Sequence, residues 1–210
     1  NIVLFNHSLL SGGFIGVDIF FVISGYLITS IIIKELYKND TISLKYFYER
    51  RIRRILPALL FVMIISFPFA WYLLLQRAFI DYSNSILSAL TFISNFYFYI
   101  TGQVYGTEDS LLKPFLHTWS LSIEEQYYIV FPILMFIIYK FLRKYIFFLL
   151  LFIFVISFMF ASYQSNSNPS YSFYMLNTRG WELMFGSILA YFEIKYGRPK
   201  KNKAIYSILV

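Results

Sequence analysis

Long apolar runs separated by short polar or basic stretches dominate the pattern along this chain. The runs cover residues 14–33, 57–75, 119–139, 145–161 and 178–194. Each approaches the ~20 residues that an α-helix needs to cross a hydrocarbon core about 30 Å thick. The pattern therefore predicts an all-α fold, a polytopic bundle of transmembrane helices.

The basic residues predict which side of the membrane each loop occupies. Most of them fall in three blocks, at residues 34–54, 140–144 and 195–203. Cytoplasmic loops carry an excess of Lys and Arg, so these blocks are expected to face the cytoplasm. The outer loops are then residues 11–13, a long stretch over 76–118, and a polar turn over 164–172.

Residues 84–100 do not fit this alternation. They are apolar enough to enter the membrane, but a single crossing would turn every later basic block outward. A re-entrant or interfacial helix is therefore expected there, and a second, unseen crossing is the alternative.

Composition excludes several classes of protein. With 59% apolar and 14% charged residues, the chain is not a soluble domain. The net charge of +7 follows from the three basic blocks, so no nucleic-acid partner is expected. The chain has no Cys, which excludes thiol chemistry. It also lacks the HxxxH and HExxH spacings that would indicate a metal site. The chain begins without Met and stops inside an apolar run, so we expect a fragment.

Ionisable residues inside apolar runs are the main candidates for chemistry, because burying a charge in a membrane is costly and is tolerated for function or pairing. His7 is either a general base or a polar residue at a helix end. Asp18 either pairs with a basic or backbone donor or orients a catalytic His. Glu124 and Glu125 are further candidates for a functional role, and the alternative is that they only complement a helix dipole. Arg179 and Glu182 are also candidates, and the alternative is that they only form a local ion pair.

Two local patterns add to these candidates. Four arginines, Arg50, Arg51, Arg53 and Arg54, precede an expected helix start with Pro57 at its first position. They indicate either an anchor on anionic lipid or recognition of a phosphorylated donor at the cytoplasmic face. The second pattern is a set of glycines around Asp18, which predicts a tight turn followed by close helix contact; they are Gly12, Gly13, Gly16 and Gly25.

In sequence order, the polar motifs are His7, GGFIGVDIFFVISGYLIT, RRIRRILPAL, HTWSLSIEEQYYIVFPIL and RGWELMFGSILA. Their order resembles that of the acyltransferase-3 family of integral membrane O-acyltransferases, which includes acetylases of O-antigen and peptidoglycan. The resemblance implies that residues 1–210 are the N-terminal part of a domain of roughly ten spans, truncated at both ends. It also implies a multi-pass protein of the bacterial cytoplasmic (inner) membrane. Some members carry a further SGNH-like domain, and whether one accompanies this chain is open.

The same resemblance implies transfer of an acyl group, expected to be acetyl, from cytoplasmic acyl-CoA to a hydroxyl of an extracytoplasmic glycan or lipid-linked sugar. O-antigen of lipopolysaccharide, capsule and peptidoglycan are the acceptors it suggests. His7 matches the catalytic base, while Asp18, Glu124 or Glu125 would orient it. The arginines would hold acyl-CoA, with Arg50 and Arg53 or Arg51 and Arg54 as the motif pair.

Two other classes stay open at this point. A transporter or flippase of lipid-linked glycan would also hold charges inside the membrane. A catalytically inactive scaffold is the third class. The expected partners are acyl-CoA, the acceptor glycan and membrane lipids, with neither a metal nor nucleic acid.

Overall fold

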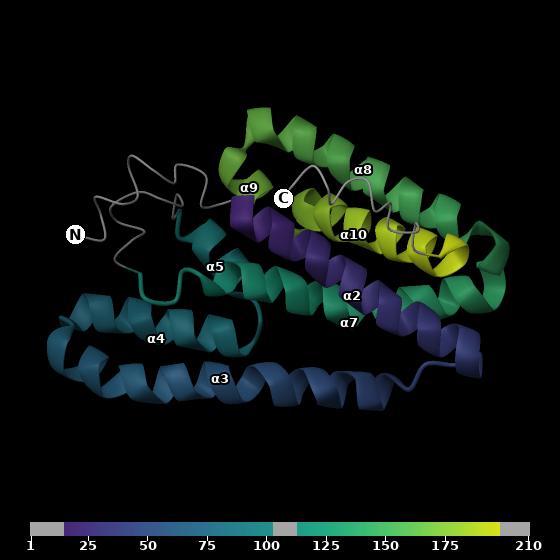
Figure 1. Cartoon of the computed structure of the whole chain (residues 1–210). Helices are drawn as coiled ribbons and strands as arrows, with labels where there is room; N and C mark the ends of the chain where they lie inside the picture. Colours follow the sequence, from purple (N-terminus) through teal and green to yellow (C-terminus); the bar gives the residue numbers. More distant parts are fainter. Residues whose placement is uncertain (1–14, 103–112, 198–210) are drawn as a thin grey trace, which may run out of the picture.

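The computed structural model describes residues 15–102 and 113–197, and within them it contains helices and no strand (Figure 1). The predicted all-α fold is confirmed for this part of the chain. The elements are α2 (Ile15–Asn39), α3 (Leu44–Leu73), α4 (Gln76–Leu90), α5 (Ser94–Ile100), α7 (Thr118–Leu142), the 3₁₀ turn η1 (Arg143–Tyr145), α8 (Ile146–Ser167), α9 (Pro169–Tyr174) and α10 (Leu176–Tyr196).

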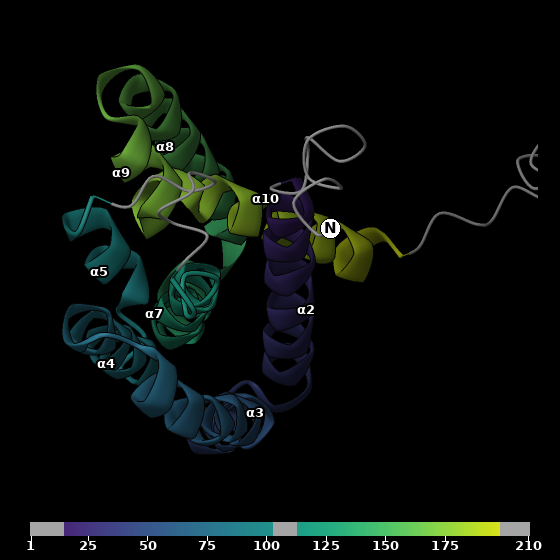
Figure 2. The same ribbon diagram turned by 90° about the vertical axis from the view of Figure 1, so that its left-hand side faces the viewer.

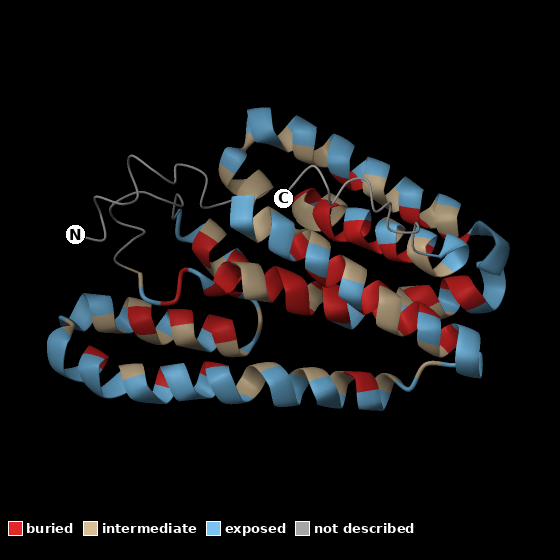
Figure 3. Cartoon of the chain, in the orientation of Figure 1, coloured by how far each residue is buried: buried red, intermediate tan, exposed pale blue. Residues whose placement is uncertain are grey.

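Helix α7 lies at the centre of the bundle. Viewed along its axis, it has α2 on one side, α4 and α5 on the other, α3 below and α8 to α10 above (Figure 2). Buried residues concentrate in α7 and α10, whereas α3 and α8 are mostly exposed (Figure 3). The exposed side chains of α3 and α8 are largely apolar, such as Phe61, Ile64 and Phe152. Such a surface suits contact with lipid or with further helices.

The closest helix contact is the crossing of α2 and α10. A Cβ atom on Gly186 would lie 1.9 Å from the carbonyl oxygen of Val22, and one on Gly25 would lie 2.0 Å from that of Leu183. Only glycine lets the two backbones approach this closely. The predicted close contact is thus confirmed at Gly25, whereas Gly16 has open space around it. Gly12 and Gly13 lie outside the described residues.

Three described segments are long and apolar enough to cross a membrane by their length and composition: Ile15–Asn39, Leu44–Leu73 and Thr118–Ser167. The third folds back on itself at η1 to give α7 and α8. Helix α10, also expected to span, packs against α2 and α8 but carries four charged residues, which lower its hydropathy. The bundle therefore has the character of an integral membrane protein.

Basic residues gather at one end of the bundle. Asp40, after the end of α2, accepts a hydrogen bond of 2.8 Å from the Tyr139 hydroxyl and lies 3.9 Å from Arg143. Lys195, in the last turn of α10, lies at the same end (Figure 1). We call this the basic end and the opposite end, where α2, α7 and α10 begin, the far end. The loop after α2 and the turn between α7 and α8 thus lie at the same end of the bundle, and their orientation in the membrane stays a prediction.

The start of α3 differs from the prediction. The helix begins at Leu44, so the arginines lie within it and Pro57 is an internal residue instead of the first one. The Tyr48 hydroxyl donates to the Ile129 carbonyl oxygen over 2.9 Å, which places these turns beside the middle of α7 and away from the basic end. Hydropathy marked only the apolar part of the helix, whereas residues such as Leu, Arg and Glu extend it because they favour helix.

The polar stretch 164–172, predicted to be a turn, is also mostly helical. Helix α8 continues to Ser167 and α9 starts at Pro169, so only Asn168 separates them. The Asn168 side chain accepts a hydrogen bond of 3.0 Å from the Tyr171 backbone N–H, and Pro169 occupies the first helical position. This N-cap with proline at N1 starts a new helix where the composition suggested a loop.

Residues 84–100 form a helical hairpin instead of one span. At 15 and 7 residues, α4 and α5 are about 22 Å and 10 Å long, too short to cross a core of about 30 Å. The hairpin is fixed to α7 by buried polar contacts: Ser94 Oγ lies 2.7 Å from Ser122 Oγ, and Gln126 Nε2 donates to Asn95 Oδ1 over 2.8 Å. The break agrees with the predicted re-entrant arrangement.

Cysteine labelling tests this topology, because the chain has no native Cys. We expect a membrane-impermeant thiol reagent, added outside, to label Cys placed at Ser110 or Asn166. Cys at Thr41, which lies between α2 and α3, should react only after the membrane is permeabilised. A protected Ser110 position beside a labelled Asn166 position would show instead that the hairpin segment crosses the membrane.

Candidate functional site

Two adjacent carboxylates are buried in α7. Glu124 is 3% exposed and Glu125 is 8% exposed, and Oε1 of each has no hydrogen-bond partner among the described residues. The hydroxyls of Ser24 in α2 and Tyr128 in α7 lie close to the Glu124 carboxylate. Neither glutamate lies in the first turn of α7, so complementing the helix dipole does not explain them. They occupy the position where α2, α3 and α7 meet.

Arg51 of α3 supplies the positive charge nearest to this pair. Its guanidinium lies 4.9 Å from the centroid of the Tyr128 ring, and its charge acts on both Glu124 and Glu125. The side chain is only partly exposed. One cation therefore faces two buried carboxylates, which is the pairing that buried charges require.

The other three arginines of the motif have different surroundings. Arg54 is exposed and lines a cavity of about 340 Å³ between α3 and α7, with His117 and Leu121 on its walls. Arg50 is exposed, with its guanidinium 4.3 Å from the centroid of the Tyr46 ring. Arg53 is exposed and pairs with Glu49 at 2.7 Å. Arg51 thus contacts α7 and the exposed Arg54 borders the cavity between α3 and α7, whereas Arg50 and Arg53 contact residues of α3 itself.

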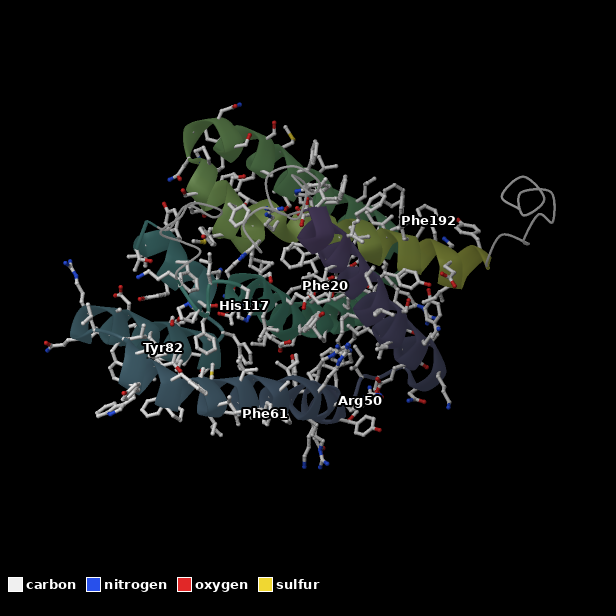
Figure 4. All side chains as sticks on the ribbon, turned by 60° about the vertical axis from the view of Figure 1, so that its left-hand side comes forward. Phe20, Arg50, Phe61, Tyr82, His117 and Phe192 are labelled. Atoms are coloured by element: carbon white, nitrogen blue, oxygen red, sulfur yellow. The ribbon has the colours of Figure 1, made fainter. Side chains whose placement is uncertain are left out.

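His117 directly precedes α7 (Figure 4) and lines this cavity. Its ring stacks on Phe115 at 6.3 Å between centroids. Partial desolvation lowers the pKa of the His117 imidazole below its ordinary value. The cavity is therefore mainly apolar, with the guanidinium of Arg54 as its permanent charge.

Asp18 belongs to a separate ionic cluster at the far end. Arg179 Nη1 donates to Asp18 Oδ1 over 2.6 Å and to Glu182 Oε1 over 2.8 Å. The predicted pairing of Asp18 with a basic residue and the predicted Arg179–Glu182 pair are both confirmed. Because His7 lies outside the described residues, orientation of a catalytic His by Asp18 stays a prediction.

Several residues of these clusters were not candidates in the sequence. Ser24 approaches Glu124 only because α2 packs against α7, and no spacing along the chain signals this. Tyr128 follows Glu124 by four residues on the same face of α7. The cavity around Arg54 and His117 likewise depends on how α3 rotates against α7. Within residues 15–102 and 113–197, no group of three or more His, Cys, Asp or Glu side chains is placed to hold a metal ion.

Comparison with known proteins identifies the family of this chain. A family model described as an acyltransferase domain matches residues 1–210, the whole chain. The chain belongs to the acyltransferase-3 family. With its membrane-capable helices, this membership makes it an integral membrane protein of an acyltransferase family.

Several members of the acyltransferase-3 family are similar in sequence. An uncharacterized protein of Haemophilus influenzae is 38% identical over 199 residues, covering 91% of this chain and 80% of the relative. The O-acetyltransferase OatA of Staphylococcus aureus is 36% identical over 203 residues, covering 93% and 33%. A putative O-acetyltransferase of Staphylococcus aureus is 38% identical over 208 residues, covering 95% and 34%.

The chain spans about a third of the length of the two O-acetyltransferase relatives. No solved structure matches it. The family resemblance seen in the sequence motifs is thereby confirmed, and the acyltransferase class with it.

Proposed function

We propose that this chain is part of a membrane O-acetyltransferase that moves an acetyl group from cytoplasmic acyl-CoA to a hydroxyl of an extracytoplasmic glycan. Peptidoglycan, capsule and lipopolysaccharide O-antigen are the acceptor types we propose, in the bacterial cytoplasmic membrane. The observation that carries the proposal is the family match over the whole chain, with relatives named O-acetyltransferases. The buried ionisable clusters supply the groups that such a reaction needs.

The charges of Arg51 and Arg54 support a division of roles. Arg51 is compensated by Glu124 and Glu125, whereas no described acidic side chain pairs with Arg54. Arg binds phosphate with two parallel hydrogen bonds, and the phosphates of CoA are such ligands. We therefore propose that Arg54 contacts the donor and that Arg51 holds the Glu124–Glu125 pair. A donor bound there enters the bundle instead of resting on its cytoplasmic surface.

His7 is the proposed general base. It takes the proton of the acceptor hydroxyl while the oxygen attacks the thioester carbonyl. The new C–O bond forms and the C–S bond breaks, and the CoA thiolate leaves and receives the proton. Asp18, Glu124 and Glu125 are the proposed groups that orient His7 or stabilise its charge.

Arg54→Gln tests the donor site. In membrane vesicles holding the whole protein and labelled acetyl-CoA, we expect the KM for acetyl-CoA to rise by about tenfold, because a charge-assisted hydrogen bond is lost. The measurement is the initial rate of label transfer to glycan as a function of acetyl-CoA concentration. Arg53→Gln is the matched control and should change this KM little, since Arg53 points outward to Glu49.

Two outcomes would contradict the proposal. If Arg53→Gln and Arg54→Gln raise the KM for acetyl-CoA equally, the assignment of the donor contact to Arg54 is wrong. If vesicles with the whole wild-type protein transfer no acetyl group but move the glycan across the membrane, the protein is a flippase.

A further inference from the structure

A polar and aromatic cleft opens at the far end of the bundle, away from the arginines of α3. It has a volume of about 470 Å³ and lies between the start of α2, the end of α8, α9 and the start of α10. The cluster of Asp18, Arg179 and Glu182 forms part of its lining. None of these residues takes part in the proposed donor site.

One carboxylate oxygen in this cleft lacks a partner. The Glu182 side chain is 1% exposed, and its Oε1 accepts from Arg179 while Oε2 has no hydrogen bond among the described residues. A buried carboxylate oxygen without a donor is costly unless a ligand supplies one. Because Glu182 also lines the cleft, a donor group that entered the cleft could supply the missing partner of this buried oxygen.

The charge of the cluster excludes an anionic ligand. Two acidic side chains, Asp18 and Glu182, share a single cation there, because Arg179 Nη1 bonds to both. Among the described residues the lining has no other acidic or basic side chain, so two carboxyl groups outnumber one guanidinium. The phosphates of acyl-CoA would be repelled there, whereas hydroxyl groups would be attracted as donors.

The remaining lining is that of a site for a polyhydroxyl compound. Trp181 lies on the wall, held by an edge-to-face contact with Phe158 at 5.4 Å between ring centroids. Ser162 and Ser165 of α8 are exposed and line the same cleft. Sugars carry hydroxyls around a ring whose C–H face packs on aromatic rings, so an indole beside carboxylate and hydroxyl groups matches both parts.

The position of the cleft also suits an acceptor outside the cytoplasm. Lys195 at the basic end follows Arg179 by 16 residues on α10, which is about 24 Å of helix. That distance is close to the thickness of the hydrocarbon core. If the basic end faces the cytoplasm, the cleft lies near the opposite surface.

We propose that this cleft binds the acceptor glycan, with Glu182 Oε2 accepting a hydrogen bond from a sugar hydroxyl and the Trp181 ring covering a sugar face. Arg179 and Asp18 hold Glu182 in place. This assignment rests on the proposed acetyl transfer and adds the site of the second substrate.

The test is steady-state transfer by the whole protein in vesicles. The acceptor is surface glycan extracted from cells that lack the protein and stripped of O-acetyl groups by mild base. With saturating acetyl-CoA, Glu182→Gln and Trp181→Ala should each raise the KM for glycan by about tenfold, because a hydrogen bond or a packing surface is lost. The KM for acetyl-CoA should stay within about twofold.

Two variants serve as matched controls. Glu193→Gln makes the same chemical change on the same helix outside the cleft and should leave both KM values unchanged. Trp181→Phe keeps an aromatic ring and should retain most of the affinity for glycan.

The outcomes separate this inference from the proposed function. Failure of the wild-type protein to transfer acetyl groups overturns the function. Wild-type transfer with an unchanged glycan KM in both Glu182→Gln and Trp181→Ala overturns the cleft as acceptor site. A loss that lowers kcat, alters both KM values and lowers the melting temperature together shows a structural ion pair and also overturns it.

Discussion

Replacing Gly186 with alanine is expected to break the α2–α10 crossing and to leave little folded protein. The added Cβ would lie 1.9 Å from the Val22 carbonyl oxygen and 2.7 Å from the Tyr26 backbone nitrogen. Backbone atoms cannot move aside as a side chain can, so one helix must shift. Overpacking of this kind costs about 3 kcal/mol or more. The melting temperature of the protein in detergent measures the effect.

Two other glycines make the comparison specific. Gly16→Ala on α2 should be neutral or slightly stabilising, because nothing lies within 4 Å and alanine favours helix over glycine. The melting temperature of Gly180→Ala on α10 should fall between those of the Gly16 and Gly186 variants, since the added Cβ would lie 3.2 Å from the Ser157 hydroxyl. Equal melting temperatures for the Gly16 and Gly186 variants would mean that the two backbones are not in contact.

His7→Ala is expected to abolish acetyl transfer by the whole protein. A general base contributes about 10²–10⁴-fold to the rate, and this variant removes the proposed base while changing little apolar surface. The measurement is O-acetylation of surface glycan by mass spectrometry, in cells that produce wild-type or variant protein at the same membrane abundance.

Rescue by added imidazole would strengthen the assignment, because a free base can replace the missing ring. Full acetylation by the His7→Ala protein at matched abundance would remove His7 from the mechanism. A fall in membrane abundance by itself would show instead that His7 contributes to folding.

The sequence predicted helices well where their apolar part coincides with the whole helix, and less well elsewhere. Helix α8 was anticipated from its apolar run, but its last turn is polar and continues through Ser165 to Ser167. Helix α3 was placed too late by 13 residues, because its first turns contain lysine, glutamate and arginine. Hydropathy reports where lipid contacts a helix, whereas backbone hydrogen bonding decides where the helix begins and ends.

The candidate site shows a similar limit. The buried carboxylates at Glu124 and Glu125 could be selected from the sequence because charges are rare inside apolar runs. The sequence could not decide between Arg50 with Arg53 and Arg51 with Arg54, since RRIRR contains both pairs at the same spacing. The rotation of α3 against α7, visible in the Arg51 contact with Tyr128, gives the arginines different surroundings, and which pair binds the donor stays a proposal. The cleft at Glu182 depends likewise on the packing of α2 against α8, α9 and α10, which lie far from it along the chain.

The triplet EEQ on α7 has a geometric consequence for any substitution near it. Successive residues of an α-helix are rotated by about 100°, so three neighbours in sequence point in three directions. Glu124 meets Ser24 of α2, and Glu125 experiences the charge of Arg51 on α3. Gln126 donates to the Phe92 carbonyl oxygen in the turn between α4 and α5 over 2.9 Å. A displacement of the hairpin turn would therefore rotate the same helical turn that carries both carboxylates, which couples the hairpin mechanically to the charged centre.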